Sequence, residues 1–144
     1  MNKFTNKLAY AVISEEVAKS NLDHSIIVKP LIVGYTSIPG NFKFSIAAGL
    51  LLDNGSLKSV LMKIKNPNGE VLTDVDLMQM YLNSTDYIDL EGIRRDYEVS
   101  IDIGLSHNQG ISVESEGIYK IEFVVNGDSL GGTFIKILDE EKRI

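Results

Sequence analysis

Apolar and polar residues alternate along several separate segments of the chain. In residues 42–50, 60–65, 97–103 and 119–125, an apolar side chain stands at every second position. Successive side chains of a β-strand point to opposite faces, so a strand with one buried face shows this period of two. The pattern predicts four strands, each with one face in a core.

Two further stretches are extended in character but less regular. Residues 8–14 and 25–36 are rich in apolar residues, and the second stretch is apolar on both faces. Pro30 interrupts it. Because proline has no backbone N–H to give to a sheet, we expect this strand to be broken, bulged or at an edge.

Turn residues stand between these segments. The sequence Asn-Pro-Asn-Gly at residues 66–69 has proline and glycine where a tight turn uses them, and Asp-Asn-Gly-Ser at 53–56 is a similar signal. Asn126 and Gly127 form the dipeptide typical of two-residue hairpins, which leads into a last strand at 132–138. These signals predict antiparallel hairpins.

Composition favours the same class. The chain has 17 Ile and 11 Val against 5 Ala, so residues that prefer strands far outnumber the best helix former. We therefore expect residues 1–144 to form one all-β domain, an antiparallel immunoglobulin-like β-sandwich of about seven to nine strands. Residues 74–96 fit neither period and are expected to be an irregular insertion or long connection, one short helix, or a strand pair.

The segment before the 119–125 strand carries a more specific signal. Ser-Glu-Gly-Ile-Tyr at residues 115–119 resembles the tyrosine corner of immunoglobulin-like domains, in which a tyrosine hydroxyl bonds to nearby backbone. The alternative is that Tyr119 is a core aromatic residue without that bond.

Charge and cysteine content narrow the partners. The chain has 14 basic and 20 acidic residues, a net charge of −6, and no cysteine. Nucleic-acid binding depends on basic surface, so we expect no nucleic-acid partner. The chain has neither a long apolar run nor a signal-peptide pattern, and we expect a cytoplasmic protein with no membrane partner, disulfide or thiolate metal site.

The sequence contains no complete catalytic motif. Residues 127–130 spell Gly-Asp-Ser-Leu, the block of a hydrolase family, but they stand near the end of the chain with no histidine after them, and a hairpin turn is the better interpretation. Residues 104–108 miss the Gly-x-Ser-x-Gly elbow at the last position. His24 and His107 both stand in polar, turn-like surroundings. We predict no catalytic residue, no metal and no cofactor.

Carboxylates are the remaining hydrolytic candidates. Asp74 and Asp76 form one pair, and Asp86, Asp89 and Glu91 form a second group. Neither has the spacing of a calcium-binding loop, so solvated loop acids are the default interpretation.

Partner binding is expected at four residues of the irregular segment. Arg94 and Arg95 could grip a partner carboxylate or phosphate, or could neutralise the acids beside them. Tyr81 and Tyr87 would be interface anchors if exposed and core residues if buried.

The order of these segments resembles small bacterial and phage β-sandwich proteins of unknown function. The likeness lies in residues 11–17, 25–28, 38–46, 66–72 and 116–127. It implies an immunoglobulin-like sandwich of bacterial or phage origin, with no catalytic residues to assign.

These observations predict a non-enzymatic module that binds a protein, such as a host protein, or assembles with itself. One alternative is a carbohydrate-binding module, which would need an outward platform made of Tyr35, Tyr81, Tyr87 or Tyr97 because the chain has no Trp. A less favoured alternative is a hydrolase that uses two carboxylates in a cleft.

Overall fold

Strands dominate the structure, which confirms the all-β class. The computed structural model describes residues 5–19, 26–52, 58–77, 87–89, 99–106 and 110–143. In chain order the elements are β1 (Lys7–Lys19), β2 (Ile26–Pro30), β3 (Val33–Thr36), β4 (Gly40–Phe42), β5 (Ser45–Leu52), β6 (Val60–Lys65), β7 (Val71–Asp76), β8 (Tyr87–Asp89), β9 (Val99–Ser106), β10 (Ile111–Val113), β11 (Gly117–Val125), β12 (Asp128–Asp139) and the 3-10 turn η2 (Glu140–Lys142). The twelve described strands exceed the expected seven to nine because β4, β8 and β10 are only three residues long.

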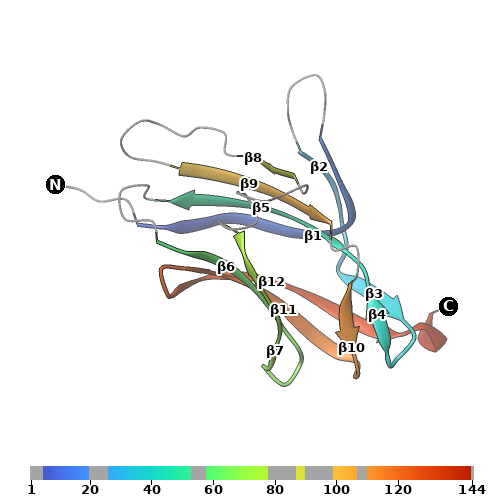
Figure 1. Cartoon of the computed structure of the whole chain (residues 1–144). Coiled ribbons are helices and arrows are strands. Elements are labelled where there is room, and N and C mark those ends of the chain that lie inside the picture. Colours follow the sequence, from blue (N-terminus) through green and yellow to red (C-terminus); the bar gives the residue numbers. More distant parts are fainter. Residues whose placement is uncertain are drawn as a thin grey trace.

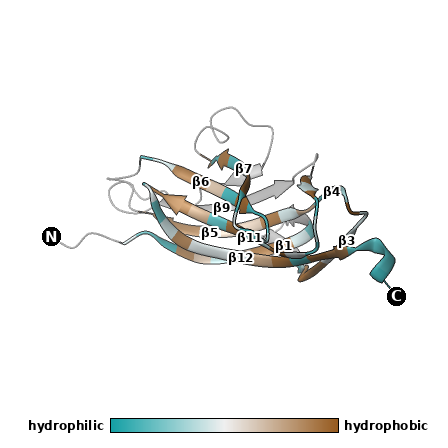
Figure 2. Cartoon of the chain, turned by 90° about the horizontal axis from the view of Figure 1, so that it is seen from below, coloured by the Kyte–Doolittle hydropathy of each residue, from teal (hydrophilic) through white to brown (hydrophobic). Residues whose placement is uncertain are grey.

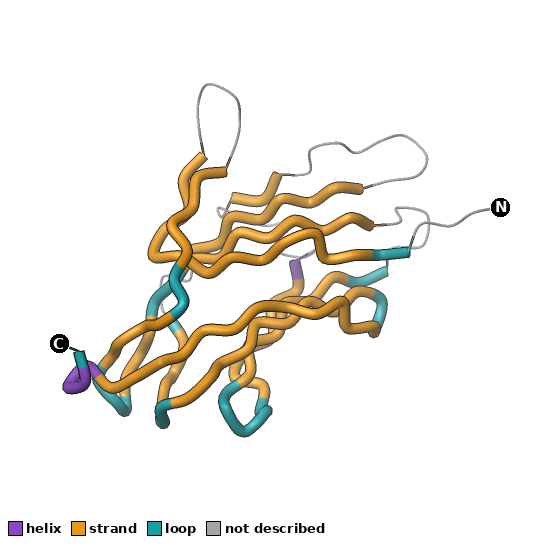
Figure 3. The backbone as a smooth tube through the Cα atoms, turned by 180° about the vertical axis from the view of Figure 1, so that it is seen from behind, coloured by secondary structure: helices purple, strands orange, loops and turns teal. Residues whose placement is uncertain are grey.

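The strands form two five-stranded sheets and a small pair. One sheet has the order β2-β1-β5-β9-β8, the other has the order β3-β12-β11-β6-β7, and β10 pairs with β4. Within the described residues every pairing is antiparallel except that of β12 with β3. The two large sheets lie face to face as two layers (Figures 1 and 3).

Both layers contribute to one apolar core. The buried cluster combines inward side chains of β1 and β5 with those of β6, β11 and β12; they include Ile13, Ile46, Ala48, Leu50, Val60, Met62, Ile64, Tyr119, Ile121, Phe123, Ile135 and Ile137. In β6 buried and half-buried positions alternate strictly, as the sequence pattern predicts. The predicted alternation therefore identifies the core face of the strand correctly.

Pro30 marks the point where the chain changes sheets. It is the last residue of β2, and the backbone N–H of Leu31 still donates to the carbonyl of Ile13 in β1, at 2.7 Å. At Ile32 the partner changes, since its carbonyl accepts from the N–H of Lys136 in β12 at 3.0 Å. The expected break of this strand is confirmed.

The predicted turn at residues 66–69 joins β6 to β7. The N–H of Gly69 donates to the carbonyl of Asn66 at 2.9 Å, and Gly69 has a φ of +85°, which favours glycine. The side-chain oxygen of Asn66 accepts from the N–H groups of Asn68 and Glu70, at 3.0 and 2.9 Å. This asparagine side chain fixes the turn from inside.

The predicted hairpin at Asn126 and Gly127 joins β11 to β12. Both residues have positive φ, +52° and +86°, which is the geometry of a type I′ turn. The Asn126 side-chain oxygen also accepts from the N–H groups of Lys58 and Ser59, at 2.7 and 3.0 Å. Residues 127–130 are thus a hairpin turn and the start of β12, as expected, whereas the turn predicted at 53–56 lies outside the described residues.

Tyr119 makes the backbone contact that its sequence context predicts. Its side chain is 1% exposed, and its hydroxyl donates to the carbonyl of Ser115 at 2.7 Å. The bond ties the start of β11 to the connection that follows β10.

Removing this hydroxyl should have a measurable cost. Tyr119→Phe leaves a carbonyl without its partner, and we expect the free energy of unfolding to fall by about 1–2 kcal/mol. Urea unfolding measures it. Tyr35→Phe is the matched control, because the half-buried Tyr35 has no hydrogen bond from its hydroxyl in the described structure; equal losses in the two variants would contradict the role of the Tyr119 bond.

The segment expected to be irregular begins and continues with strand. Residues 74–76 belong to β7, so that strand runs past the expected boundary at 74, and residues 87–89 form β8. The other residues of 74–96, except Leu77, lie outside the described part of the chain.

Figure 2 shows hydrophobic and hydrophilic segments following one another along β12, with η2 hydrophilic. Among the described residues, no helix has the length and apolar content needed to cross a membrane.

Candidate functional site

The partner-binding residues predicted from sequence fall where little is described. Tyr81, Arg94 and Arg95 lie outside the described residues, and of Tyr87 only the backbone is described, as the first residue of β8. Their role in binding stays a prediction.

The candidate catalytic groups are placed only in part. Asp74 and Asp76 are exposed on β7, a strand at the edge of its sheet. His24, His107, Asp86 and Glu91 lie outside the described residues, and Asp89 is described only as the last backbone position of β8.

The described surface offers a different candidate, on the outer face of the β3-β12-β11-β6-β7 sheet. In the register of β11 with β12, Ile118 lies opposite Lys136 and Lys120 lies opposite Phe134. Residues directly opposite in an antiparallel pair share a face, and so do residues two apart in one strand. We call Ile118, Lys120, Phe134 and Lys136 the β11–β12 quartet.

The quartet exposes two apolar side chains whose neighbours along the strands are buried in the core. Ile118 and Phe134 are each 57% exposed, among the most exposed large apolar residues of the described structure. The inward neighbours Tyr119 and Ile135 are buried in the core. The Lys120 ammonium also lies 5.8 Å from the centre of the Phe134 ring, a favourable cation–π contact.

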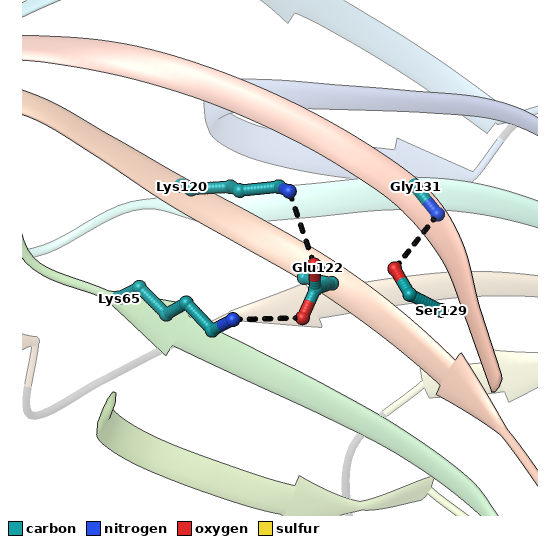
Figure 4. Close-up of polar contacts among 5 residues, drawn as sticks. All are labelled: Lys65, Lys120, Glu122, Ser129 and Gly131. Carbon is teal, nitrogen blue, oxygen red and sulfur yellow. Dashed lines mark hydrogen bonds and ion pairs between the residues drawn. The ribbon is translucent and has the colours of Figure 1, made fainter. Parts of the chain in front are cut away.

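A buried carboxylate organises the same face. The side chain of Glu122 is 11% exposed, and its two oxygens lie 3.1 Å from the ammonium of Lys65 and 3.0 Å from that of Lys120. Figure 4 shows Glu122 on β11 between Lys120 of the same strand and Lys65 of β6. Because Lys65 and Lys120 lie opposite each other in the register, Glu122 also relieves the repulsion between them.

These contacts fix the charge of Glu122. The hydrogen bond from Lys120, and after it that from Lys65, lowers the pKa of the Glu122 carboxyl from 4.5 to about 2, against the opposing effect of burial. The carboxylate is therefore ionised throughout the physiological range of pH.

Gly132 makes room for this arrangement. It lies opposite Glu122 in β12, and a Cβ atom added at Gly132 would fall 2.9 Å from the Cα of Glu122 and on top of the carbonyl oxygen of Ile121. Only glycine lets the two strands approach so closely.

A polar groove lies at the start of β11, beside Tyr119. It has a volume of about 380 Å³ and is lined by Asn66, Asn68, Glu70, Leu72, Ser112, Glu114, Ser115 and Tyr119. The β6–β7 turn forms one side, and β10 with the connection after it forms the other. The carboxylates of Glu70 and Glu114 make no ion pair within the described part of the chain.

Sequence reasoning did not find the quartet, although a signal was present. Tyr119, Ile121 and Phe123 set the core phase of β11, so Ile118 is an apolar residue in the polar phase. Phe134 stands out of phase in β12 in the same way, next to the buried Ile135. Two apolar residues on the solvent side of one hairpin indicate an interaction surface.

Neither a metal centre nor a relative adds to this description. Among the described residues, no group of three or more His, Cys, Asp or Glu could hold a metal ion. Comparison with protein-family models, curated proteins and solved structures found no match for this chain. The resemblance to small bacterial and phage β-sandwich proteins therefore stays a prediction from the sequence.

Proposed function

We propose that this protein is a non-enzymatic module that binds another protein through the outer face of the β3-β12-β11-β6-β7 sheet. The observation that carries the proposal is the pair of exposed apolar side chains, Ile118 and Phe134, which are diagonal neighbours on a hairpin backed by the core. Aromatic and aliphatic anchors with a polar rim are what protein interfaces use.

The proposal includes an immunoglobulin-like sandwich. The orders β1-β5-β9-β8 and β6-β11-β12 correspond to the A-B-E-D and C-F-G sheets of that fold, with the strands in the same sequence along the chain. The Tyr119 bond at the start of β11 matches the position of a tyrosine corner. A cytoplasmic location and a bacterial or phage origin, with a host protein as the target, complete the proposal and rest on sequence alone.

Substitution of Phe134, the aromatic residue of the exposed pair, tests the binding function. Phe134→Ser should leave folding intact, because the side chain is mostly exposed, and should weaken capture of the partner from bacterial lysate at least tenfold, as loss of an interface anchor does. Quantitative mass spectrometry of the captured proteins measures it. Leu51→Ser, at a 50% exposed position of the other sheet, is the matched control. A protein captured equally by both variants would place the binding elsewhere.

A second candidate function rests on the polar groove. Amide, carboxylate and hydroxyl groups such as those of Asn68, Glu70 and Ser112 are the groups that bind sugar hydroxyls. Tyr35, by contrast, already has the Arg143 guanidinium over its ring, at 5.6 Å from the centre. A glycan array distinguishes the two candidates: binding that Glu70→Gln abolishes and Phe134→Ser spares would favour the carbohydrate function.

A further inference from the structure

We infer that the β11–β12 quartet binds an acidic protein surface, and that this partner is not a second copy of the chain. The inference rests on the proposed function and specifies the chemistry of the partner. It follows from how charge is distributed on the outer face.

The lysines around the two anchors outnumber the acids. Lys65, Lys120 and Lys136 carry three positive charges against one negative charge on Glu122, in a chain of net charge −6. The Glu116 carboxylate also acts on Lys136, but Glu116 forms an ion pair with Lys142, so this pair adds no net charge. Other acids of this face, Asp74 and Asp76, stand on the edge strand β7. The surface around Ile118 and Phe134 is therefore locally basic.

These positive charges still have hydrogen bonds to give. Both oxygens of Glu122 are engaged, one by each neighbouring lysine. An ammonium has three donors, so Lys120 keeps donors for a partner, and the exposed Lys136 forms no ion pair in the described part of the chain. A partner that covers the quartet has to supply carboxylates, or it leaves ammonium groups buried and unpaired at a cost.

The geometry favours apolar and acidic groups in alternation. Ile118 and Phe134 lie on one diagonal of the quartet, and Lys120 and Lys136 lie on the other. An apolar side chain packed between the first two brings flanking carboxylates over the second two. An extended or flat surface that alternates apolar and acidic residues has this arrangement.

A second copy does not supply these groups. A symmetric contact would place the same patch on both sides, and the quartet itself contains two lysines and no acid. The carboxylates beside it are already paired, that of Glu122 with two lysines and that of Glu116 with Lys142. The negative charge elsewhere on the chain acts weakly on an approaching acidic partner, because salt screens charges beyond about 8 Å.

A titration with defined probes tests the partner chemistry. The ¹⁵N-labelled full chain is titrated with a synthetic peptide of alternating Glu and Leu, and in parallel with peptides in which Lys or Ser replaces Glu. We expect the Glu peptide alone to shift the amide resonances of the quartet, with an affinity that falls several-fold when NaCl rises from about 0.05 M to about 0.3 M. Lys136→Glu should lower that affinity about tenfold, and Lys43→Glu, the same charge change at an exposed position outside both large sheets, should not.

The outcomes distinguish failure of the acidic-partner inference from failure of the proposed binding function. If the Ser or Lys peptide shifts the quartet as strongly as the Glu peptide, the face binds protein but the acidic partner is wrong. If no peptide shifts the quartet, the inference fails. If in addition Phe134→Ser retains every captured protein, the proposed function fails as well. Light scattering completes the test, since a dimer that Phe134→Ser dissociates would show that a second copy occupies the face.

Discussion

Gly132→Ala is expected to destabilise the protein by about 3 kcal/mol, which for a domain of this size lowers the melting temperature by roughly 10 °C. The added methyl group would overlap the carbonyl oxygen of Ile121 and crowd the Cα of Glu122. Both are backbone atoms of the neighbouring strand, so no side chain can turn away to make room. The two strands would have to separate where they present the quartet. Thermal unfolding followed by circular dichroism measures the change.

Gly69→Ala is the control for the loss of a glycine. Gly69 has a φ of +85° with open space around the position of a Cβ atom, so alanine there adds conformational strain of about 1 kcal/mol and no overlap. A melting temperature for Gly132→Ala close to that of Gly69→Ala would show that β11 and β12 do not approach as closely as the structure has them.

Glu122→Gln is expected to have the second large effect, and one that depends on pH. A carboxyl group whose pKa falls from 4.5 to about 2 on folding contributes on the order of 3 kcal/mol at neutral pH. The pKa is lower in the folded state, so this contribution is complete above pH 4.5 and is lost as the pH falls towards 2. Glutamine has nearly the same shape but no charge, and it leaves Lys65 and Lys120 facing each other.

The difference in free energy of unfolding between wild type and Glu122→Gln separates the contribution of Glu122 from that of the other acids. Urea unfolding of both proteins at several pH values should show a difference in free energy of unfolding of about 3 kcal/mol at pH 7. This gap should narrow between pH 4.5 and 2. Glu114→Gln, at an exposed carboxylate without an ion pair among the described residues, should show a small gap at every pH. A gap for Glu122→Gln that stays constant with pH would contradict the ion-pair account.

The parts of the fold that depend on local sequence could be predicted. Alternation identifies the core face of β6, Asn126 and Gly127 form the predicted hairpin, and Pro30 breaks its strand where expected. Each of these depends on residues within a few positions of one another. The bond of Tyr119 to Ser115 spans only four residues, and the local sequence indicates it as one of two interpretations of this tyrosine.

The parts that depend on distant residues could not be predicted. The parallel pairing of β3 with β12 brings together residues about one hundred positions apart, and no local pattern encodes it. Glu122 looks like any polar residue of an alternating strand until Lys65 is placed beside it. The quartet likewise exists only once β11 and β12 are in register, although Ile118 and Phe134 were detectable as apolar residues in the wrong phase.

Site-specific photo-crosslinking tests the central claim, that the outer face carrying the quartet is the binding surface, most directly. A photoreactive phenylalanine analogue is placed at position 134, or at position 51 on the other sheet as the control, and irradiated in bacterial cells that express the full chain. We predict a discrete crosslinked protein from position 134, none from position 51, and loss of the crosslink when Lys136→Glu is combined with the probe. Crosslinks from position 51 alone, or the same products from both positions, would contradict the assignment of function to this face.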